Sequence, residues 1–346
     1  MNRERILSLL GYNAFFWFAF WLCAYWTFPY EWLAAFLSDK VNESGSGYTL
    51  EIGALSPYWL TGVQLEQVKV RKQAAETLAT PPDPKGAPAL DQAIKIDVAH
   101  ARLGLLSLLT GSTKLSFGAE LGSGEIEGTY QESGDEKQVV ATLSKVDLAK
   151  LPLLESLISL PTKGMLTGDF DLTLGKQASK TNGNVNLTIE KLTVGDGKAK
   201  FKVGTMGGLT IDPINAGDVQ IALDVKEGTG TVKKLTANGP DLQLEGSGDI
   251  HFAQPLSRSR LGVLLRLKLT DAYRNKTSRT KTMFALLEGS GTPQLAAART
   301  TDGSYQLRLS GTLAATRALP AGNQGVPPSG APSAMPAATT GPDDDE

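Results

Sequence analysis

Two hydrophobic patterns divide this chain of 346 residues. Residues 6–28 form an apolar run of 23 residues without a charge. Beyond residue 48, apolar positions alternate with polar ones in short segments that Gly, Asn, Asp and Pro separate. A long apolar run predicts a membrane-length helix, whereas the period of two predicts antiparallel strands with one apolar and one wet face.

The apolar run predicts a transmembrane anchor. At about 1.5 Å per residue the helix would be roughly 34 Å long, enough to cross a hydrocarbon core of roughly 30 Å. Arg3 and Arg5 precede the run, so we expect residues 1–5 in the cytoplasm and the bulk of the chain across the membrane. The residues expected to face lipid are Phe15, Phe16, Trp17, Phe18, Phe20, Trp21, Leu22, Tyr25 and Trp26.

A cleaved signal peptide is the alternative interpretation of the same run. Its apolar region would be about 7–15 residues long, followed by a small-x-small cleavage site. Here the run is longer and ends in bulky residues, from Trp26 to Tyr30, which favours a retained anchor. Residues 29–47 are expected to form a juxtamembrane helix, over Glu31 to Leu37, and a flexible linker.

Residues 48–318 predict a large antiparallel, strongly curved β-sheet of about a dozen strands with two or three short helices. Gly246 and Gly248 share the apolar parity of their strand, and glycines there permit strong curvature. The alternation slips by one residue at Glu190–Lys191, which predicts a β-bulge. Short helices are expected at Leu103–Gly111, Asp147–Leu160 and Thr282–Leu287, and an exposed loop at Ala74–Ala89. Residues 319–346, rich in Pro and Ala and ending in four acids, predict a disordered tail.

Charge and cysteine content narrow the possible functions. The formal net charge is −2, which gives no electrostatic indication of nucleic-acid binding. Cys23 is the sole cysteine and lies inside the apolar run, so a disulfide within the chain and a multi-cysteine metal site are both excluded.

The sequence offers few candidates for chemistry. The two histidines are interpreted structurally: His100 at the end of an apolar strand face, and His251 facing solvent. Glu125/Glu127 and Asp169/Asp171 project from strand faces at two-residue spacing, a pattern that binds a cation or simply covers a solvated face. We expect no catalytic, cofactor-binding or metal site, and therefore no enzyme.

Residues 258–281 hold eight basic residues and a single acid, Asp271. This run is a candidate interaction surface for anionic headgroups or an acidic partner, or else a wet strand face followed by a polar loop. The residues proposed for that surface are Arg258, Arg260, Arg266, Lys268, Arg274 and Lys276.

Three regions carry recognisable motifs, which are loose patterns of glycine and aliphatic residues. They are TFPYEWL (Thr27 to Leu33), GLLSLLTG (Gly104 to Gly111), and TMFALLEGSGTPQ with the later YQLRLSGTL, between Thr282 and Leu313. Together they resemble the type II secretion system protein N family, GspN, in its AsmA-like branch. The resemblance covers the chain from the apolar run to about Leu313 and leaves out the acidic tail.

The resemblance implies a non-enzymatic, single-pass protein of the bacterial inner membrane with its bulk in the periplasm. Such a protein would contact other subunits of the secretion system. AsmA-like proteins imply an alternative function, in which an apolar β-groove holds the acyl chains of phospholipid. The family brings no catalytic residues or cofactors to this chain.

Overall fold

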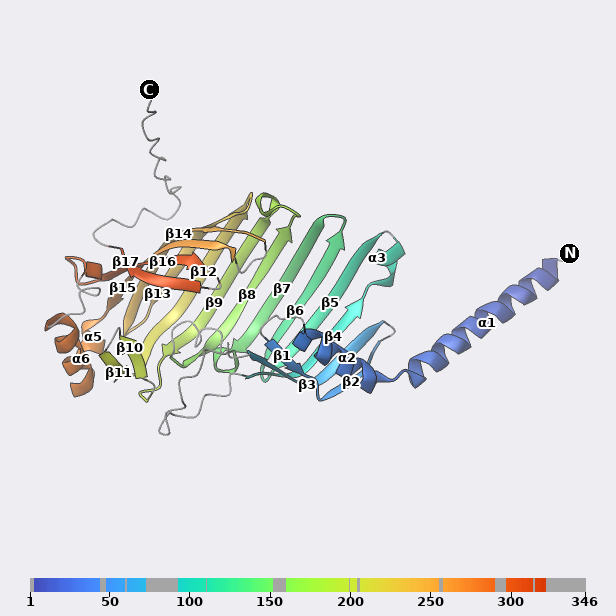
Figure 1. The fold of residues 1–346 in the computed structure, drawn as a ribbon, viewed down its shortest axis with the longest axis horizontal. Helices are drawn as coiled ribbons and strands as arrows, with labels where there is room; N and C mark the ends of the chain where they lie inside the picture. Colours follow the sequence, from blue (N-terminus) through green and yellow to red (C-terminus); the bar gives the residue numbers. More distant parts are fainter. Residues whose placement is uncertain are drawn as a thin grey trace, which may run out of the picture.

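The computed structural model describes residues 3–43, 48–59, 61–72, 93–109, 111–151, 160–198, 200–203, 206–254, 258–289, 297–313 and 315–321. Within these ranges the protein is mainly β, with one 15-stranded antiparallel sheet and a separate two-stranded hairpin (Figure 1). The predicted fold class, a large antiparallel sheet with few helices, is confirmed.

The sheet is built almost wholly from strands that follow one another in the chain. Its order is β1-β3-β4-β5-β6-β7-β8-β9-β12-β13-β14-β15-β16-β17, and β2 also pairs with β3. The strands are β1 (Tyr48–Glu51), β2 (Ala54–Tyr58), β3 (Gly62–Lys72), β4 (Ala93–Leu103), β5 (Ser112–Leu121), β6 (Gly124–Ser133), β7 (Glu136–Asp147), β8 (Thr162–Leu174), β9 (Asn182–Val194), β12 (Ile214–Lys226), β13 (Thr229–Asn238), β14 (Leu242–His251), β15 (Arg260–Leu269), β16 (Tyr305–Thr312) and β17 (Ala315–Pro320).

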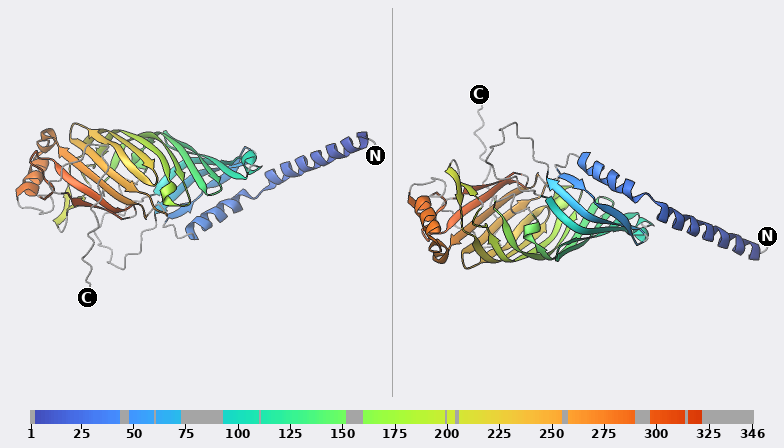
Figure 2. Two further views of the ribbon diagram at one scale, coloured as in Figure 1. Left: turned by 90° about the horizontal axis from the view of Figure 1, so that it is seen from above. Right: turned by 90° about the horizontal axis from the view of Figure 1, so that it is seen from below.

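The remaining elements lie at the margins of the sheet. They are the hairpin β10 (Lys200–Val203) and β11 (Met206–Thr210), the helices α1 (Arg3–Thr27), α2 (Tyr30–Glu43), α3 (Leu105–Leu109), α5 (Asp271–Arg274) and α6 (Ser278–Gly289), and the 3-10 turns η1 (Leu148–Lys150) and η2 (Ala178–Lys180). The sheet curls, and the strands at its two ends turn toward the same side (Figures 1 and 2). Among the described strands, the path of pairing runs from β1 to β17 and does not close on itself.

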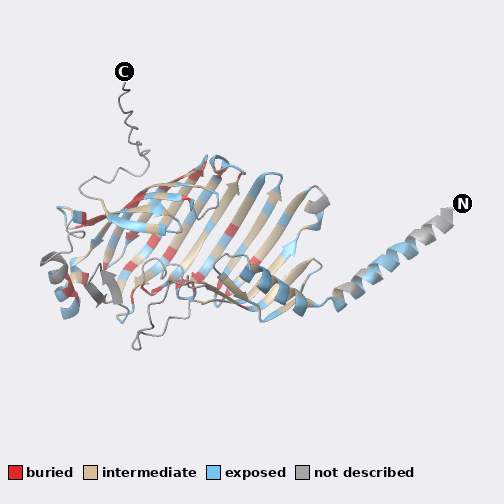
Figure 3. Cartoon of the chain, viewed as in Figure 1, coloured by how far each residue is buried: buried red, intermediate tan, exposed pale blue. Residues whose placement is uncertain are grey.

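Strand register places the apolar side chains of successive strands on one face. One row crosses β7, β8, β9, β12 and β13 through Val146, Leu166, Ile189, Val219 and Ala237, each opposite the next. Exposed and partly exposed positions alternate along the strands, as the period of two requires (Figure 3). The other face is mainly polar, although Val140 and Leu264 also lie on it.

β-Bulges lie beside that row and bend the strands. The predicted bulge is confirmed: Lys191 has φ +52, and two residues of β9, Lys191 and Leu192, oppose one of β8, Gly164. The neighbouring bulges are at Lys145 in β7 and Gly217 in β12, with φ +49 and +68. A bulge increases local twist and bend, so bulges at one level of adjacent strands crease the sheet.

Glycine on the apolar face makes close strand contacts. A Cβ on Gly168 would lie 2.1 Å from the carbonyl oxygen of Asn186, and one on Gly246 would lie 2.4 Å from Cδ2 of Leu235. Gly246 and Gly248 oppose Leu265 and Val263 of β15, so the predicted placement of both glycines on the apolar face is confirmed.

The helical predictions are confirmed in part. The short helix expected at Leu103–Gly111 is α3, and the one expected at Thr282–Leu287 is the longer α6. The helix expected after the apolar run continues to Glu43 as α2, beyond Leu37. Within Asp147–Leu160 only η1 is described, where the Asp147 carboxylate accepts from the Ala149 amide at 3.0 Å; residues 152–159 lie outside the described ranges.

Other expectations fall partly or wholly outside the described residues. The loop expected at Ala74–Ala89 and the tail beyond residue 321 lie outside them. The strand β17 runs to Pro320, so the β domain extends past the boundary predicted at residue 318. The sequence prediction omitted β10 and β11: β10 alternates over only four residues, KFKV, and β11, MGGLT, contains two glycines.

Helix α1 extends away from the sheet (Figures 1 and 2). Its described side chains include Phe15, Phe16, Trp17 and Phe18, which are 61–69% exposed. Among the described residues, no helix meets the combined criteria of length and mean hydropathy for a membrane span, so the predicted span at 6–28 lacks this support.

Candidate functional site: the apolar face of the sheet

The middle of the apolar face is formed by strands β8, β9 and β12. Phe170 of β8 opposes Val185 of β9, and Val185 opposes Leu223 of β12. One step along the strands, Leu187 opposes Ile221. All five side chains are partly exposed, although large aliphatic and aromatic residues at the centre of a sheet are ordinarily covered by a second layer.

The same face continues to both sides of this centre. Toward β5 it is lined by Tyr130, Val139, Phe117 and Ala141, and toward β16 by Leu235, Leu244, Ile250, Leu261, Val263, Leu265, Leu267, Leu307 and Leu309. From β5 to β16 it crosses ten strands, or roughly 43 Å at about 4.8 Å per strand spacing. We call this surface, with its centre at Phe170, the apolar face.

The elements that pack on the apolar face lie along one margin. Leu148 of η1 packs against Ile189, Val219 and Ala237. Further along the same margin, Tyr273 of α5 and Phe284 of α6 form a cluster that includes Leu160 and Ile211. Among the described residues, no helix or second sheet lies over the centre of the face. Within the described part of the chain, the centre is therefore a continuous apolar surface without a protein layer on it.

The opposite face is polar, and two of its carboxylates accept hydrogen bonds from neighbouring side-chain amides. Asp171 accepts a hydrogen bond from the Gln138 amide at 3.0 Å, and Asp169 from the Asn186 amide at 3.4 Å. Glu125 and Glu127 are exposed on β6. In the described part of the chain, no three His, Cys, Asp or Glu side chains converge as metal ligands would.

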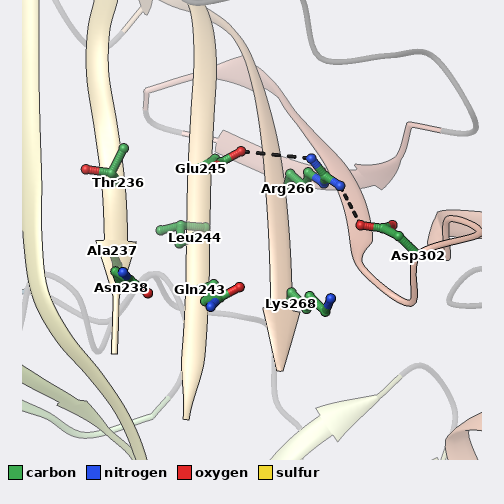
Figure 4. Close-up of a pocket in the computed structure, with 9 residues that line it drawn as sticks. All are labelled: Thr236, Ala237, Asn238, Gln243, Leu244, Glu245, Arg266, Lys268 and Asp302. Atoms are coloured by element: carbon green, nitrogen blue, oxygen red, sulfur yellow. Dashed lines mark hydrogen bonds and ion pairs between the residues drawn. The ribbon is translucent and has the colours of Figure 1, made fainter. Parts of the chain in front are cut away.

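A hollow of about 450 Å³ lies on the polar face of β13, β14 and β15 (Figure 4). Its central residue is Arg266, whose guanidinium forms an ion pair with Asp302 and lies 4.0 Å from the Glu245 carboxylate. The other lining residues are Thr236, Ala237, Asn238, Gln243, Leu244 and Lys268. The strands supply most of this lining, and Asp302 arrives from the turn before β16.

The Asp302 carboxylate is held ionised by its surroundings. It accepts hydrogen bonds from the hydroxyls of Thr300 and Ser304 and from Arg266, and these contacts hold its pKa well below the usual range. The ion pair therefore fastens the turn at 300–304 to β15. Arg266 is already paired with Asp302, and Asp302 already accepts hydrogen bonds from Thr300 and Ser304. We therefore interpret the hollow as a structural contact.

The basic residues at 258–281 do not gather into one surface. Arg260 and Lys268 lie near opposite ends of β15, with Arg266 paired as above. Lys276 donates to the Asp241 carboxylate at 2.8 Å, and the Arg274 guanidinium lies 4.8 Å from the centre of the Phe284 ring. The structure thus separates the predicted cations and gives several of them local partners, while Arg258 is exposed.

The histidines have structural surroundings. His251 is exposed, as predicted, opposite Thr229 and Arg260. His100 was expected to close the apolar face, and this is wrong: its ring lies over Gly118 and packs on Tyr58, with 4.7 Å between ring centres. Gly118, the partner of His100 on β5, lies opposite Glu127 of β6, so His100 belongs to the polar row of these strands, which the parity of β4 alone did not reveal.

The predicted anchor residues lie along α1. Phe15, Phe16, Trp17, Phe18, Phe20 and Leu22 have exposed side chains, and the Tyr25 hydroxyl donates to the backbone carbonyl of Trp59. The side chains of Trp21 and Trp26 lie outside the described part of the structure. These side chains are little buried within the protein, so their role depends on the environment outside the chain.

Comparison with known proteins gives no family. No family model, curated protein or solved structure matches this chain.

Proposed function

We propose that the apolar face holds the acyl chains of phospholipid or a similar amphiphile. The observation that carries this proposal is the centre of the face, where Phe170, Val185, Leu187 and Leu223 are partly exposed with no described element over them. Each acyl CH₂ removed from water there would contribute about 0.8 kcal/mol. A curved open sheet lets the polar headgroup remain in water at its rim.

The described polar groups support a carrier over a catalyst. The carboxylates of the other face are paired with amides or open to solvent, and Asp302 is paired with Arg266. Acid–base chemistry requires convergent groups beside a substrate pocket, and the described residues show none on the apolar face.

Helix α1 supports attachment of this carrier to a bilayer. It has 25 residues, so it is roughly 37 Å long, and its exposed rings include Phe16 and Phe20. Aromatic side chains exposed to water on several sides of a helix favour transfer into an apolar environment. We therefore retain the inner membrane, with a cytoplasmic N-terminus and a periplasmic body, as the proposed location.

Photo-crosslinking tests the carrier function directly. Phe170 is replaced by p-benzoyl-phenylalanine in the full-length chain, cells are irradiated, and the purified protein is analysed by mass spectrometry. The matched control carries the same group at Asp169, the adjacent residue on the polar face. We expect a phospholipid adduct at position 170 and little or none at position 169. Equal labelling, or no lipid adduct at position 170, would contradict the proposal.

A type II secretion subunit is a second proposal, from the motif resemblance. The open edge of β17 favours it, since among the described residues no strand pairs beyond β17 and an exposed edge accepts a strand from another protein. Crosslinks from an exposed β17 residue, Arg317, would then capture a secretion component. Deletion of the gene would also trap secreted proteins in the periplasm. If deletion leaves secretion intact while Phe170 captures lipid, this second proposal fails.

A further inference from the structure

An exposed apolar surface lies at the β2–β4 end of the sheet, apart from the apolar face. It consists of Trp59, Leu103, Leu105 and Leu106, whose exposed fractions are 68, 42, 57 and 80%. We call these four residues the tip surface. Single exposed leucines are ordinary, but four large apolar side chains on two adjoining turns form a patch that points to an interaction.

Backbone and side-chain hydrogen bonds hold the two turns together. The amide of Leu103 donates to the carbonyl of Thr61 at 3.3 Å, and the hydroxyl of Thr61 donates to the carbonyl of Leu103 at 2.7 Å. The Ser107 hydroxyl donates to the Gly104 carbonyl at 2.6 Å and accepts from the Lys114 amide at 3.2 Å. These bonds fix α3 against β5, so the exposure of Leu105 and Leu106 is a property of an ordered turn.

Trp59 occupies a backbone conformation that its size disfavours. Its φ is +51, in the left-handed region where bulky residues are outliers. The ring is exposed, so packing within the chain does not offset the cost. A strained position that presents an aromatic ring to the outside favours a functional role, and Trp is enriched where proteins meet the membrane–water interface.

The tip surface is connected to α1. The Tyr25 hydroxyl, close to the end of α1, donates to the carbonyl of Trp59. Figures 1 and 2 show α3 and β2 at the end of the sheet from which α1 extends. Arg102 and Lys114 are exposed beside the tip, and their charges complement anionic headgroups.

We propose that the tip surface inserts into the headgroup–acyl boundary of the same bilayer that holds α1. This inference rests on the proposed membrane attachment. It places the β2–β4 end of the sheet on the membrane, so that one end of the apolar face opens onto lipid. Membrane contact through two separate elements also fixes the orientation of the sheet, which a helix joined by a linker would leave variable.

Depth-dependent fluorescence tests the insertion in the full-length chain. Cys23→Ser removes the sole cysteine, and Leu106→Cys then carries an environment-sensitive nitrobenzoxadiazole label. Asp135→Cys, in the turn between β6 and β7, is the matched control, because its side chain is 72% exposed and belongs to the same tethered sheet. Both proteins are reconstituted in vesicles of phosphatidylethanolamine and phosphatidylglycerol, and flotation is measured first.

We expect both chains to float, with emission shifted to the blue and quenched severalfold more by spin-labelled lipid at position 106 than at position 135. Floating chains whose two labels both stay in water would overturn the tip proposal and leave the attachment through α1 standing. A blue shift at position 106 that needs no vesicles and resists spin-labelled lipid would also overturn it, because it indicates a protein contact. Chains that fail to float contradict the attachment as well; lipid capture at Phe170 is measured independently of both.

Discussion

The backbone amide of Lys191 donates a hydrogen bond to the Asp218 carboxylate, with 2.9 Å between nitrogen and Oδ1. Lys191 is the bulged residue of β9, and Asp218 lies on β12 next to the bulge at Gly217. The bulge removes this amide from the regular ladder, and the carboxylate of the neighbouring strand replaces the missing acceptor. Two adjacent bulges are thereby joined at the crease of the sheet.

Asp218→Ala should therefore weaken the crease. The Lys191 amide would lose its acceptor and turn to water, because Asp218 is exposed, so we expect a loss of about 1 kcal/mol in the free energy of unfolding. Chemical denaturation measures this change. Asp218→Asn keeps an acceptor oxygen and should lose less. Equal stability of Asp218→Ala and the wild type would show that the bond adds nothing to the crease.

Gly168→Ala should destabilise the sheet, although it adds only a methyl group. The new Cβ would lie 2.1 Å from the Asn186 carbonyl oxygen and 2.8 Å from the Leu187 Cα, both backbone atoms. The strands β8 and β9 must separate to admit it, at a cost of about 1–3 kcal/mol. Gly262→Ala is the control, since its Cβ would meet nothing nearer than 3.6 Å. Thermal unfolding of the two variants distinguishes close approach from a general effect of alanine.

Tyr273 should make the free energy of unfolding fall at alkaline pH. Burial, together with the charges of Asp212 and Asp241, raises the pKa of its phenol to about 12. In the unfolded chain the phenol ionises from about pH 10, so deprotonation favours the unfolded state and the wild type loses stability as the pH rises through that window.

Tyr273→Phe separates this contribution from other alkaline effects. Near pH 7 the variant should be less stable by about 1 kcal/mol, because the phenol hydroxyl donates to the Asp212 carbonyl at 2.7 Å. Above about pH 10 the difference in the free energy of unfolding between the two proteins should shrink, because only the wild type has a phenol here that ionises more readily in the unfolded chain. A difference that stays constant from neutral to alkaline pH would contradict the assignment.

Asp302→Asn should loosen the turn at 300–304. The lowered pKa of Asp302 means that the folded state favours the carboxylate, so its contribution is present at neutral pH and is lost as the pH falls below about 4. Hydrogen exchange of the turn amides should be faster in the variant at neutral pH, and the difference should narrow in acid. Glu245→Gln is the control, because Glu245 lies 4.0 Å from Arg266 and should change the exchange little.

The alternation of apolar and polar residues determined much of the fold. It predicted the antiparallel strands, the glycines on the apolar face and the bulge at Lys191, since a period of two depends only on residues close in sequence. His100 shows the limit of that argument: its partner Gly118 lies opposite Glu127, and this polar row is revealed only by the pairing of three strands. The basic residues show another limit, because charge along the chain does not reveal pairs such as Lys276 with Asp241.

The uncovered apolar face and the tip surface could be identified only from the tertiary structure. The sequence showed that one face of the sheet is apolar, but it left open whether a second layer covers that face, because covering is a contact between distant segments. In the described structure the packed margin lies at Leu148 and Tyr273, and the centre at Phe170 has no layer. The turn that carries Trp59 is likewise joined to the end of β4 by the bonds between Thr61 and Leu103, which are far apart in the chain and meet only in the folded sheet.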